Sequence, residues 1–198
     1  MKMCLEVKWL QQLTVDLEET MSNARIIAAA RNEAELVSAI MSKAEIIFML
    51  SPNIETLEKQ AKAVHNAGKK FFIHLDLAEG IGKDEYGIRF AKGLGVDGII
   101  STRSAIIKIA KKEGLLAVQR FFIIDSQSLK MTIETAKTSK CDMIEIMPAT
   151  VTKVIKKLKN ELEMPIVSGG LIETDEEINQ AISSGAFAIS TGKEEFWN

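Results

Sequence analysis

Short apolar runs alternate with longer amphipathic segments along this chain, from residue 24 to the end. Eight such runs occur, at residues 24–30, 45–50, 70–78, 97–102, 116–124, 142–148, 165–170 and 186–191. Most of them are continuously apolar, which is typical of strands in a parallel sheet that is buried on both faces. The segments between the runs have the length and the amphipathic pattern of helices. The pattern therefore predicts a series of eight strand–helix units.

Capping residues and glycines mark the ends of several predicted helices. Asn53 precedes the predicted helix 55–65, and Thr174 precedes the predicted helix 175–183. Glu177 is placed to complete a capping box with Thr174. Glycines stand where three helices should end and the next strands begin, namely Gly68, Gly114 and Gly185.

The eight units predict one compact domain that spans residues 1–198. The predicted fold class is α/β, a small, all-parallel (β/α)8 barrel with little room for insertions. A doubly wound open sheet is the alternative, but such a sheet seldom repeats its unit this often without a break.

The two ends of the chain complete the predicted barrel. Residues 192–198, after the eighth strand, are too few for a full outer helix. Apolar residues recur every four positions near the N-terminus, at Leu5, Trp9, Leu13 and Leu17. We therefore predict that segment 1–22 forms a helix that packs on the barrel and covers the gap between the eighth and first strands.

Composition and charge narrow the function classes. Hydrophobic residues make up 46% and charged residues 26% of the chain, as in soluble globular proteins. The formal net charge of -2 provides no global positive field, so any contact with nucleic acid must come from a local patch. Cys4 and Cys141 form no C-x-x-C pair and are expected to be reduced thiols. With no signal peptide and no apolar run long enough to span a bilayer, we expect a cytoplasmic protein without a membrane partner.

Polar residues gather where the predicted strands end, and in such barrels the carboxyl ends of the strands carry the binding groups. Asp76, Arg120 and Glu145 lie within or beside strongly apolar runs. An unpaired charge buried there would destabilise the fold. These three side chains are therefore expected to pair with each other, with a ligand or with a metal.

The ends of the last two strands suggest a phosphate site. Gly169 and Gly170 follow the seventh strand, and Ser190, Thr191 and Gly192 follow the eighth. Barrels often bind phosphate with the loops after these two strands, where glycines let backbone N–H groups approach a dianion. The alternative is that these glycines only form tight turns.

Histidine and carboxylate chemistry is less specific in this sequence. His74 and Asp76 share one strand face, but no third group completes a catalytic set, so no catalytic residue is predicted. Asp76, Glu79 and Glu145 offer oxygen ligands that suit Mg²⁺, but no spacing demands a metal. We therefore predict neither a metal nor another cofactor.

Two predicted helices carry lysines at helical spacing. The first helix has Lys108, Lys111 and Lys112, and the second has Lys153, Lys156 and Lys157. Such runs usually form a solvated outer face. The alternative is an electrostatic footprint for RNA on an otherwise acidic protein.

Beyond these patterns, the chain resembles a known family in HLDLAEGIGKDEYGIRFAK, DGIISTRSAIIKIAKKEGL, QRFFIIDSQSL, DMIEIMP, PIVSGGLI and GAFAISTGKEEFW. These strings are similar to the bacterial glycerol uptake operon antiterminator regulatory protein family and occur in the expected order, and the resemblance covers most of the chain from about residue 31 to residue 197. The resemblance implies a TIM-barrel-like regulator that responds to glycerol 3-phosphate. It also implies binding to the leader mRNA of glycerol-utilisation genes, so that transcription continues past a terminator. It does not imply an enzyme.

The sequence departs from the family pattern at Ala149, where a glycine is expected, and at Thr191-Gly192, where Thr-Ser is usual.

The residue pattern and the resemblance together imply a ligand site on the barrel rim. The phosphate would contact Gly169, Gly170, Ser190, Thr191 and Gly192. The glycerol hydroxyls would contact Asp76, Glu79 and Glu145, while Arg120 pairs with these carboxylates or reaches the phosphate and Asp125 holds Arg120. The loop 79–86 is expected to become ordered when the ligand binds.

Two other functions remain as alternatives. One is an enzyme that acts on a small phosphorylated metabolite, with Asp76, Glu145 and His74 as its acid–base residues. The other is a sensor that acts through a protein partner instead of RNA. A homo-oligomer is compatible with each of these functions.

Overall fold

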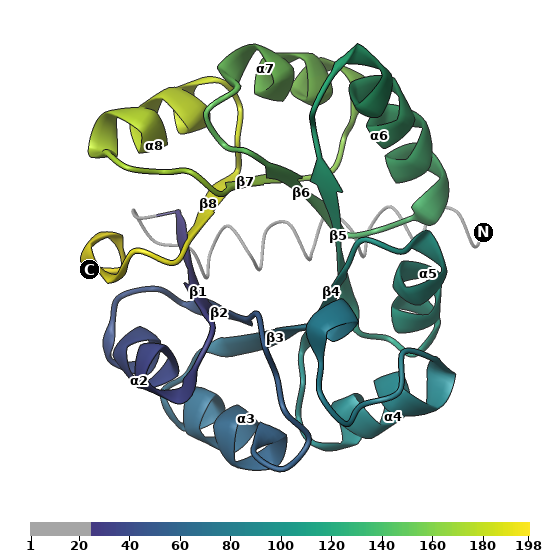
Figure 1. The fold of residues 1–198 in the computed structure, drawn as a ribbon, viewed down its shortest axis with the longest axis vertical. Coiled ribbons are helices and arrows are strands. Elements are labelled where there is room, and N and C mark those ends of the chain that lie inside the picture. Colours follow the sequence, from purple (N-terminus) through teal and green to yellow (C-terminus); the bar gives the residue numbers. More distant parts are fainter. Residues whose placement is uncertain (1–24) are drawn as a thin grey trace, which may run out of the picture.

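Eight parallel strands close into a barrel in this computed structural model, which describes residues 25–198 (Figure 1). Each strand pairs with its sequence neighbours, and β1 pairs with β8 to close the ring. The predicted (β/α)8 barrel is therefore confirmed, and the open-sheet alternative is wrong. The helix predicted for segment 1–22 and the thiol of Cys4 lie outside the described residues.

All eight strands lie within the predicted apolar runs. They are β1 (Ile26–Ala30), β2 (Ile46–Met49), β3 (Lys70–His74), β4 (Gly98–Ser101), β5 (Leu116–Phe122), β6 (Met143–Met147), β7 (Ile166–Gly169) and β8 (Ala188–Thr191). The helices of the described residues form the outer layer: α2 (Glu33–Met41), α3 (Leu57–Asn66), α4 (Glu85–Gly93), α5 (Ser104–Lys112), α6 (Ser126–Ser139), α7 (Thr152–Glu161) and α8 (Asp175–Ser183). Two short 3-10 turns are η1 (Leu75–Leu77) and η2 (Glu194–Phe196).

Alternating side chains divide the core into two apolar layers. One buried cluster lies between the strands and the helices, and a smaller one fills the inside of the barrel. In the inner cluster the rings of Phe48 and Phe72 have centroids 5.5 Å apart. Gly98 faces them, and a Cβ atom there would be only 2.3 Å from the Phe72 ring. This packing closes the inside of the barrel up to the strand ends, where His74, Arg120 and Glu145 are buried.

The C-terminal residues cover the outer face between α8 and α2, where the turn η2 lies (Figure 1). Trp197, directly after η2, belongs to the outer core cluster and is 2% exposed. Its indole N–H donates to the Thr191 carbonyl over 2.8 Å, and its own carbonyl accepts the N–H of Lys43. After β8, a short turn and one large aromatic ring therefore cover the barrel where a helix follows each of the other strands.

Helix caps agree with the sequence at one predicted position. The Thr174 hydroxyl accepts the N–H of Glu177, whose side chain in turn accepts the N–H of Thr174. This confirms the capping box of α8. The glycines predicted to follow helices all have positive φ angles, of 74° at Gly68, 77° at Gly114 and 107° at Gly185.

The prediction that Asn53 caps a helix over 55–65 is wrong. Helix α3 begins two residues later, at Leu57. The Asn53 side chain accepts the N–H of Glu55 over 2.9 Å, and its carbonyl accepts the N–H groups of Thr56 and Leu57. Asn53 therefore stabilises a separate turn before the helix. Its sequence signature, an Asn two residues ahead of a polar segment, is the same for a turn and for a cap.

Two further properties are the reactivity of Cys141 and the hydropathy of the helices. Burial raises the pKa of the free Cys141 thiol to about 11, so this cysteine is not a reactive thiolate at neutral pH. Within residues 25–198, none of the helices combines the length and the hydropathy that a membrane span requires.

Candidate functional site

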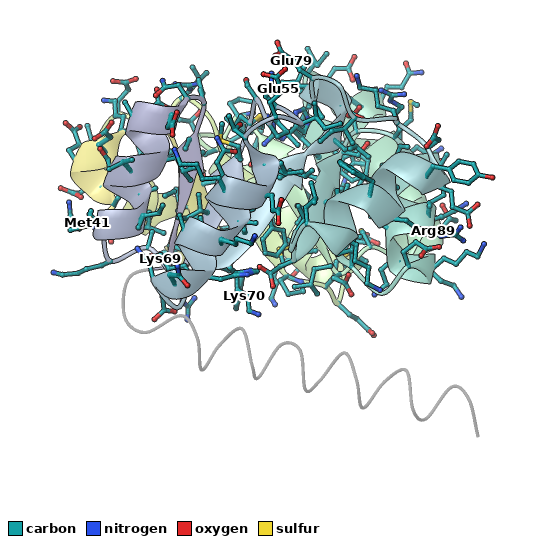
Figure 2. The ribbon with its side chains drawn as sticks, turned by 90° about the horizontal axis from the view of Figure 1, so that it is seen from below. Met41, Glu55, Lys69, Lys70, Glu79 and Arg89 are labelled. Carbon is teal, nitrogen blue, oxygen red and sulfur yellow. The ribbon has the colours of Figure 1, made fainter. Side chains whose placement is uncertain are left out.

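The candidate site lies at the end of the barrel where the strands finish. Glu79 and Glu55 project at that end in the side view of Figure 2, while Lys69 and Lys70, where β3 begins, lie at the opposite end. At the strand ends the barrel interior changes from apolar to polar, with His74, Arg120 and Glu145 all buried.

Arg120 and Glu145 form a buried ion pair inside this end of the barrel. They are partners in the register of β5 and β6, so their side chains point to the same face. The Arg120 Nε donates to Glu145 Oε2 over 2.6 Å, and the two residues are 6% and 0% exposed. Of the alternatives that the sequence left open for these charges, the structure shows pairing with each other.

Ser190 completes this network from β8. Its hydroxyl donates to the second oxygen of Glu145, Oε1, over 2.6 Å. A Cβ atom on Gly169 would lie 2.2 Å from Ser190 Oγ and 3.1 Å from Glu145 Oε1. The glycine at the end of β7 therefore makes room for the hydrogen bond between Glu145 and Ser190.

Asp125 does not hold Arg120, which corrects the sequence prediction. Its carboxylate accepts the backbone N–H of Ser128 over 2.7 Å and caps helix α6. Hydrogen bonds from Ser128 lower the pKa of Asp125. Glu145 is the nearer partner because it is adjacent to Arg120 in the sheet register, whereas Asp125 lies three residues beyond the end of β5.

Asp76 fastens the end of β3 to the end of β4. It lies in η1 and accepts hydrogen bonds from Ser101 Oγ (2.8 Å), from Thr102 N–H (2.8 Å) and from Thr102 Oγ1 (2.9 Å). Arg103 Nε lies 3.2 Å from the same carboxylate. Burial alone would raise the pKa of Asp76, but these hydrogen bonds bring it below its ordinary value. Asp76 is therefore an anion with most of its hydrogen-bonding capacity already used.

Glu79 lies apart from the other two carboxylates. It is exposed and accepts the side-chain N–H of Asn53 over 2.9 Å. Asp76, Glu79 and Glu145 thus have three separate sets of partners, and residues 25–198 contain no group of three potential metal ligands. The loop that follows Glu79 is shorter than predicted, because α4 begins at Glu85 and Asp84 caps it.

His74 is a buried polar side chain at the strand ends that lacks hydrogen-bond partners among the described residues. It is 5% exposed, and neither ring nitrogen makes a hydrogen bond. The distance from Nε2 to Asp76 Oδ2 is 3.8 Å, which is too long for a hydrogen bond. Burial lowers the pKa of His74 to about 4; the nearby charge of Arg120 acts in the same direction, and Asp76 opposes both. The ring is therefore neutral at pH 7.

The ends of β7 and β8 present backbone donors. Gly170 and Leu171 have positive φ angles of 77° and 59°. Across the described residues, the N–H groups of Gly170, Leu171 and Gly192 donate to no protein acceptor. The Ser190 hydroxyl is engaged elsewhere, because it donates to Glu145. The Thr191 hydroxyl accepts the N–H of Lys193 and keeps its own O–H for donation. The potential phosphate donors at these two strand ends are therefore these main-chain N–H groups and the Thr191 hydroxyl.

Comparison with known proteins identifies the family. Residues 26–197 match the family model described as glycerol-3-phosphate responsive antiterminator. The chain belongs to this antiterminator family. The Escherichia coli (strain K12) protein YgcP is 38% identical over 173 residues, which cover 87% of this chain and 91% of that protein.

Solved structures of the same kind superpose on the whole described barrel. The glycerol uptake operon antiterminator regulatory protein from Listeria monocytogenes has a TM-score of 0.84 and 35% identity, covering 89% of this chain and 96% of that one. A glycerol uptake operon antiterminator-related protein from Thermotoga maritima has a TM-score of 0.79 and 32% identity, covering 88% and 98%. Aldolase structures at 15% identity or less share the fold alone.

Ala149, where a glycine was expected from the sequence, is part of the protein interior. It is fully buried and donates its N–H to the Gly170 carbonyl over 3.1 Å. Its methyl group is part of the core. This substitution therefore packs against the protein interior rather than covering the open end.

Two of the three α5 lysines that the sequence offered as an RNA footprint pair with acids of the protein. Lys111 pairs with Asp142, which is 2% exposed and also accepts the N–H of Ala117. Lys112 pairs with Glu85 over 3.1 Å. Lys108 is exposed. Helical spacing shows which residues share a face, but it does not show which of them have an acid on a neighbouring element.

The lysines of α7 differ from those of α5. Lys153, Lys156 and Lys157 are exposed, and within the described part of the chain they form no ion pair. They therefore retain a concentrated positive charge on one helix of a protein whose formal net charge is -2.

Sequence reasoning placed Arg31 at a strand end but gave it no role in the site. It directly follows β1 and, because the barrel is closed, lies beside the end of β8. A Cβ atom on Gly192 would be 3.1 Å from Nη2 and 3.2 Å from Nη1 of Arg31. The available signal was its position immediately after the first apolar run.

Proposed function

We propose that this protein senses glycerol 3-phosphate at the open end of its barrel and binds the leader mRNA of glycerol-utilisation genes. Through this binding, transcription would continue past a terminator, and the protein would act in the cytoplasm without a catalytic step. Membership of the antiterminator family supports this proposal. The structural observation that carries it is the state of His74.

His74 favours a hydroxyl-bearing ligand. A buried polar group without a hydrogen bond destabilises the folded state, so its retention needs a functional reason. A neutral imidazole has one nitrogen that donates and one that accepts. Hydroxyl groups can satisfy both nitrogens, because each hydroxyl donates and accepts. Arg120, which donates to Glu145 only from Nε among the described residues, has its terminal nitrogens left for an oxygen of the same ligand.

Main-chain donors favour a phosphate at the other side of the site. Within residues 25–198, the N–H groups of Gly170, Leu171 and Gly192 make no protein hydrogen bond. Backbone N–H groups at the ends of barrel strands are suited to a dianion. A ligand with a phosphate at one end and hydroxyls at the other matches both halves of the site, and glycerol 3-phosphate has this composition.

Calorimetric titration with glycerol 3-phosphate tests the ligand. We expect saturable binding, with much weaker binding of glycerol and of inorganic phosphate, because each control makes only half of the contacts. The same mixture is assayed for products. Turnover would support the enzyme alternative, and the absence of binding would contradict the proposed ligand.

Helix α7 is the proposed RNA surface. RNA affinity depends on the cations that neutralise phosphates, and unpaired lysines contribute more than lysines already held by an acid. The three exposed lysines of α7 meet this condition, whereas Lys111 and Lys112 do not. We therefore place the RNA contact on α7 and assign Lys111 a structural role.

Charge reversal on α7 should weaken RNA binding by about 30-fold or more near physiological salt, because three phosphate contacts are lost. The variant is Lys153→Glu/Lys156→Glu/Lys157→Glu, measured by filter binding to the leader RNA over a range of salt concentrations. The slope of log affinity against log salt should become shallower by about 2, at roughly 0.7 for each contact on single-stranded RNA.

A matched control reverses lysines that already pair with acids. Lys59 pairs with Glu33, and Lys62 pairs with Glu58. The variant Lys59→Glu/Lys62→Glu should change affinity far less than the α7 variant. An equal loss in both variants would mean that only net charge matters. RNA binding that α7 reversal leaves unchanged would exclude this surface, and a wild type that binds no leader RNA would favour a protein partner.

A further inference from the structure

Arg31 is the rim cation that the surrounding carboxylates leave unpaired. Two acids lie close to it in sequence, but both have other partners. Glu35 accepts the backbone N–H of Arg31 (2.7 Å) and the side-chain N–H of Asn32 (2.8 Å). Glu33 pairs with Lys59 over 3.2 Å. Within residues 25–198, the Arg31 guanidinium forms no ion pair.

Other cations near the strand ends are held by protein groups. Arg120 pairs with Glu145, and Arg103 lies 3.2 Å from Asp76. Lys193 pairs with Glu173 over 2.7 Å, and Lys83 donates to the Ala78 carbonyl. Arg31 is thus distinguished from its neighbours by its available charge, not by its exposure.

The position of Arg31 relates it to the free N–H groups. Its guanidinium lies against Gly192, where a Cβ atom would be 3.1 Å from Nη2. Gly192 follows β8, and Gly170 and Leu171 follow β7. Since β7, β8 and β1 are consecutive around the barrel, the cation and the three free N–H groups come from adjacent strand ends.

We propose that Arg31 binds the phosphate group of the ligand, together with the N–H groups of Gly170, Leu171 and Gly192. A guanidinium presents two parallel N–H donors that match two phosphate oxygens, and it keeps its charge at all physiological pH values. Because Gly192 has no side chain, the Arg31 guanidinium can lie next to the backbone N–H of Gly192. This inference rests on the proposed function and assigns the phosphate to the β7–β8–β1 side of the site.

A side chain at position 192 would crowd the guanidinium, since a Cβ atom there would lie within 3.1–3.3 Å of three Arg31 atoms. In this chain the guanidinium occupies that space.

The experiment compares two exposed rim arginines by calorimetry with glycerol 3-phosphate. Arg31→Gln should weaken binding by about 10- to 100-fold, the usual effect of losing charge-assisted hydrogen bonds. Arg31→Lys should recover part of the loss, since it restores the charge but not the paired donors. Arg103→Gln is the matched control and should change the affinity by less than about 3-fold, because Arg103 is held by Asp76.

A second variant tests the position of Arg31 without removing its charge. Gly192→Ala places a methyl group against the guanidinium, so binding should weaken several-fold while the protein keeps its unfolding midpoint. Equal affinities of wild type and Arg31→Gln, or an equal loss in Arg103→Gln, would overturn the inference.

Inorganic phosphate separates this inference from the proposed function. If wild type binds inorganic phosphate but not glycerol 3-phosphate, and Arg31→Gln weakens the phosphate binding, then the phosphate contact stands and the proposed ligand fails. If wild type binds glycerol 3-phosphate and Arg31→Gln binds it equally well, the proposed function stands and the inference fails. If wild type binds neither molecule, both are wrong.

Discussion

Replacing Glu145 by alanine should lower the free energy of unfolding by about 3–5 kcal/mol, the usual effect of removing one partner of a buried ion pair. Glu145 is fully buried, and both of its oxygens accept hydrogen bonds. The change leaves the charge of Arg120, which is 6% exposed, without its counterion. It also leaves the Ser190 hydroxyl without its acceptor. Urea denaturation at pH 7 measures the loss.

A double variant shows whether the loss comes from the uncompensated charge. In Arg120→Met/Glu145→Met two apolar side chains of similar length replace the pair, and such replacements are often neutral or stabilising. We expect the double variant to recover most of the stability that Glu145→Ala loses. Asp125→Ala, which removes an exposed helix cap, should cost only about 0.5–2 kcal/mol. A cost for Glu145→Ala no greater than that of Asp125→Ala would contradict the buried pair.

The fold was predictable because strands buried on both faces leave a simple pattern. Every strand of the barrel lies inside a continuous apolar run, and the glycine positions correctly marked where three helices end. The start of α3 was not predictable in the same way. Asn53 forms a turn instead of a cap, and these two structures use the same side chain for the same kind of hydrogen bond.

The site was predictable in its residues more than in its contacts. The apolar surroundings of Arg120 and Glu145 correctly indicated that these charges must be compensated. Their partners depend on register: Arg120 meets Glu145 across the β5–β6 pairing, and Ser190 reaches Glu145 from β8. A single sequence does not contain this register. It therefore assigned Ser190 to the ligand and Asp125 to Arg120.

The same limit explains the lysines and Arg31. Lys111 is part of a regular basic stripe in the sequence, yet it pairs with Asp142, which lies 31 residues further along the chain. Arg31 is one charged residue after an apolar run, and its relevance becomes visible only when β1 closes against β8. Contacts between distant parts of the chain therefore remove Lys111 from the candidate RNA-binding residues and add Arg31 to the candidate ligand-binding residues.

Replacing His74 by phenylalanine should stabilise the protein by about 1–3 kcal/mol at pH 7, since a phenyl ring of similar shape removes two buried nitrogens without hydrogen bonds. Urea denaturation measures the gain. The same variant should bind glycerol 3-phosphate much more weakly, because the proposed partner of the hydroxyl groups is gone. A loss of stability would show that the imidazole is satisfied in solution.

The pH dependence of the free energy of unfolding should further distinguish wild type from His74→Phe. Burial lowers the pKa of His74 to about 4 from an ordinary value of 6.5, so between these pH values the unfolded chain binds a proton that the folded chain does not. Wild-type stability should therefore fall as the pH drops through this window, by on the order of 3 kcal/mol in all. His74→Phe should lack this component, whereas His65→Gln, which keeps His74, should retain it.

Asp76 acts in a different range: its pKa lies below 3.8, so the stability that it contributes is lost only as the pH falls below that value. Parallel pH profiles for wild type and His74→Phe would mean that the ring is not buried in its neutral form. A steeper wild-type profile, together with the stabilised but weakly binding variant, would show that this barrel retains an unfavourable side chain at its centre because the ligand uses it.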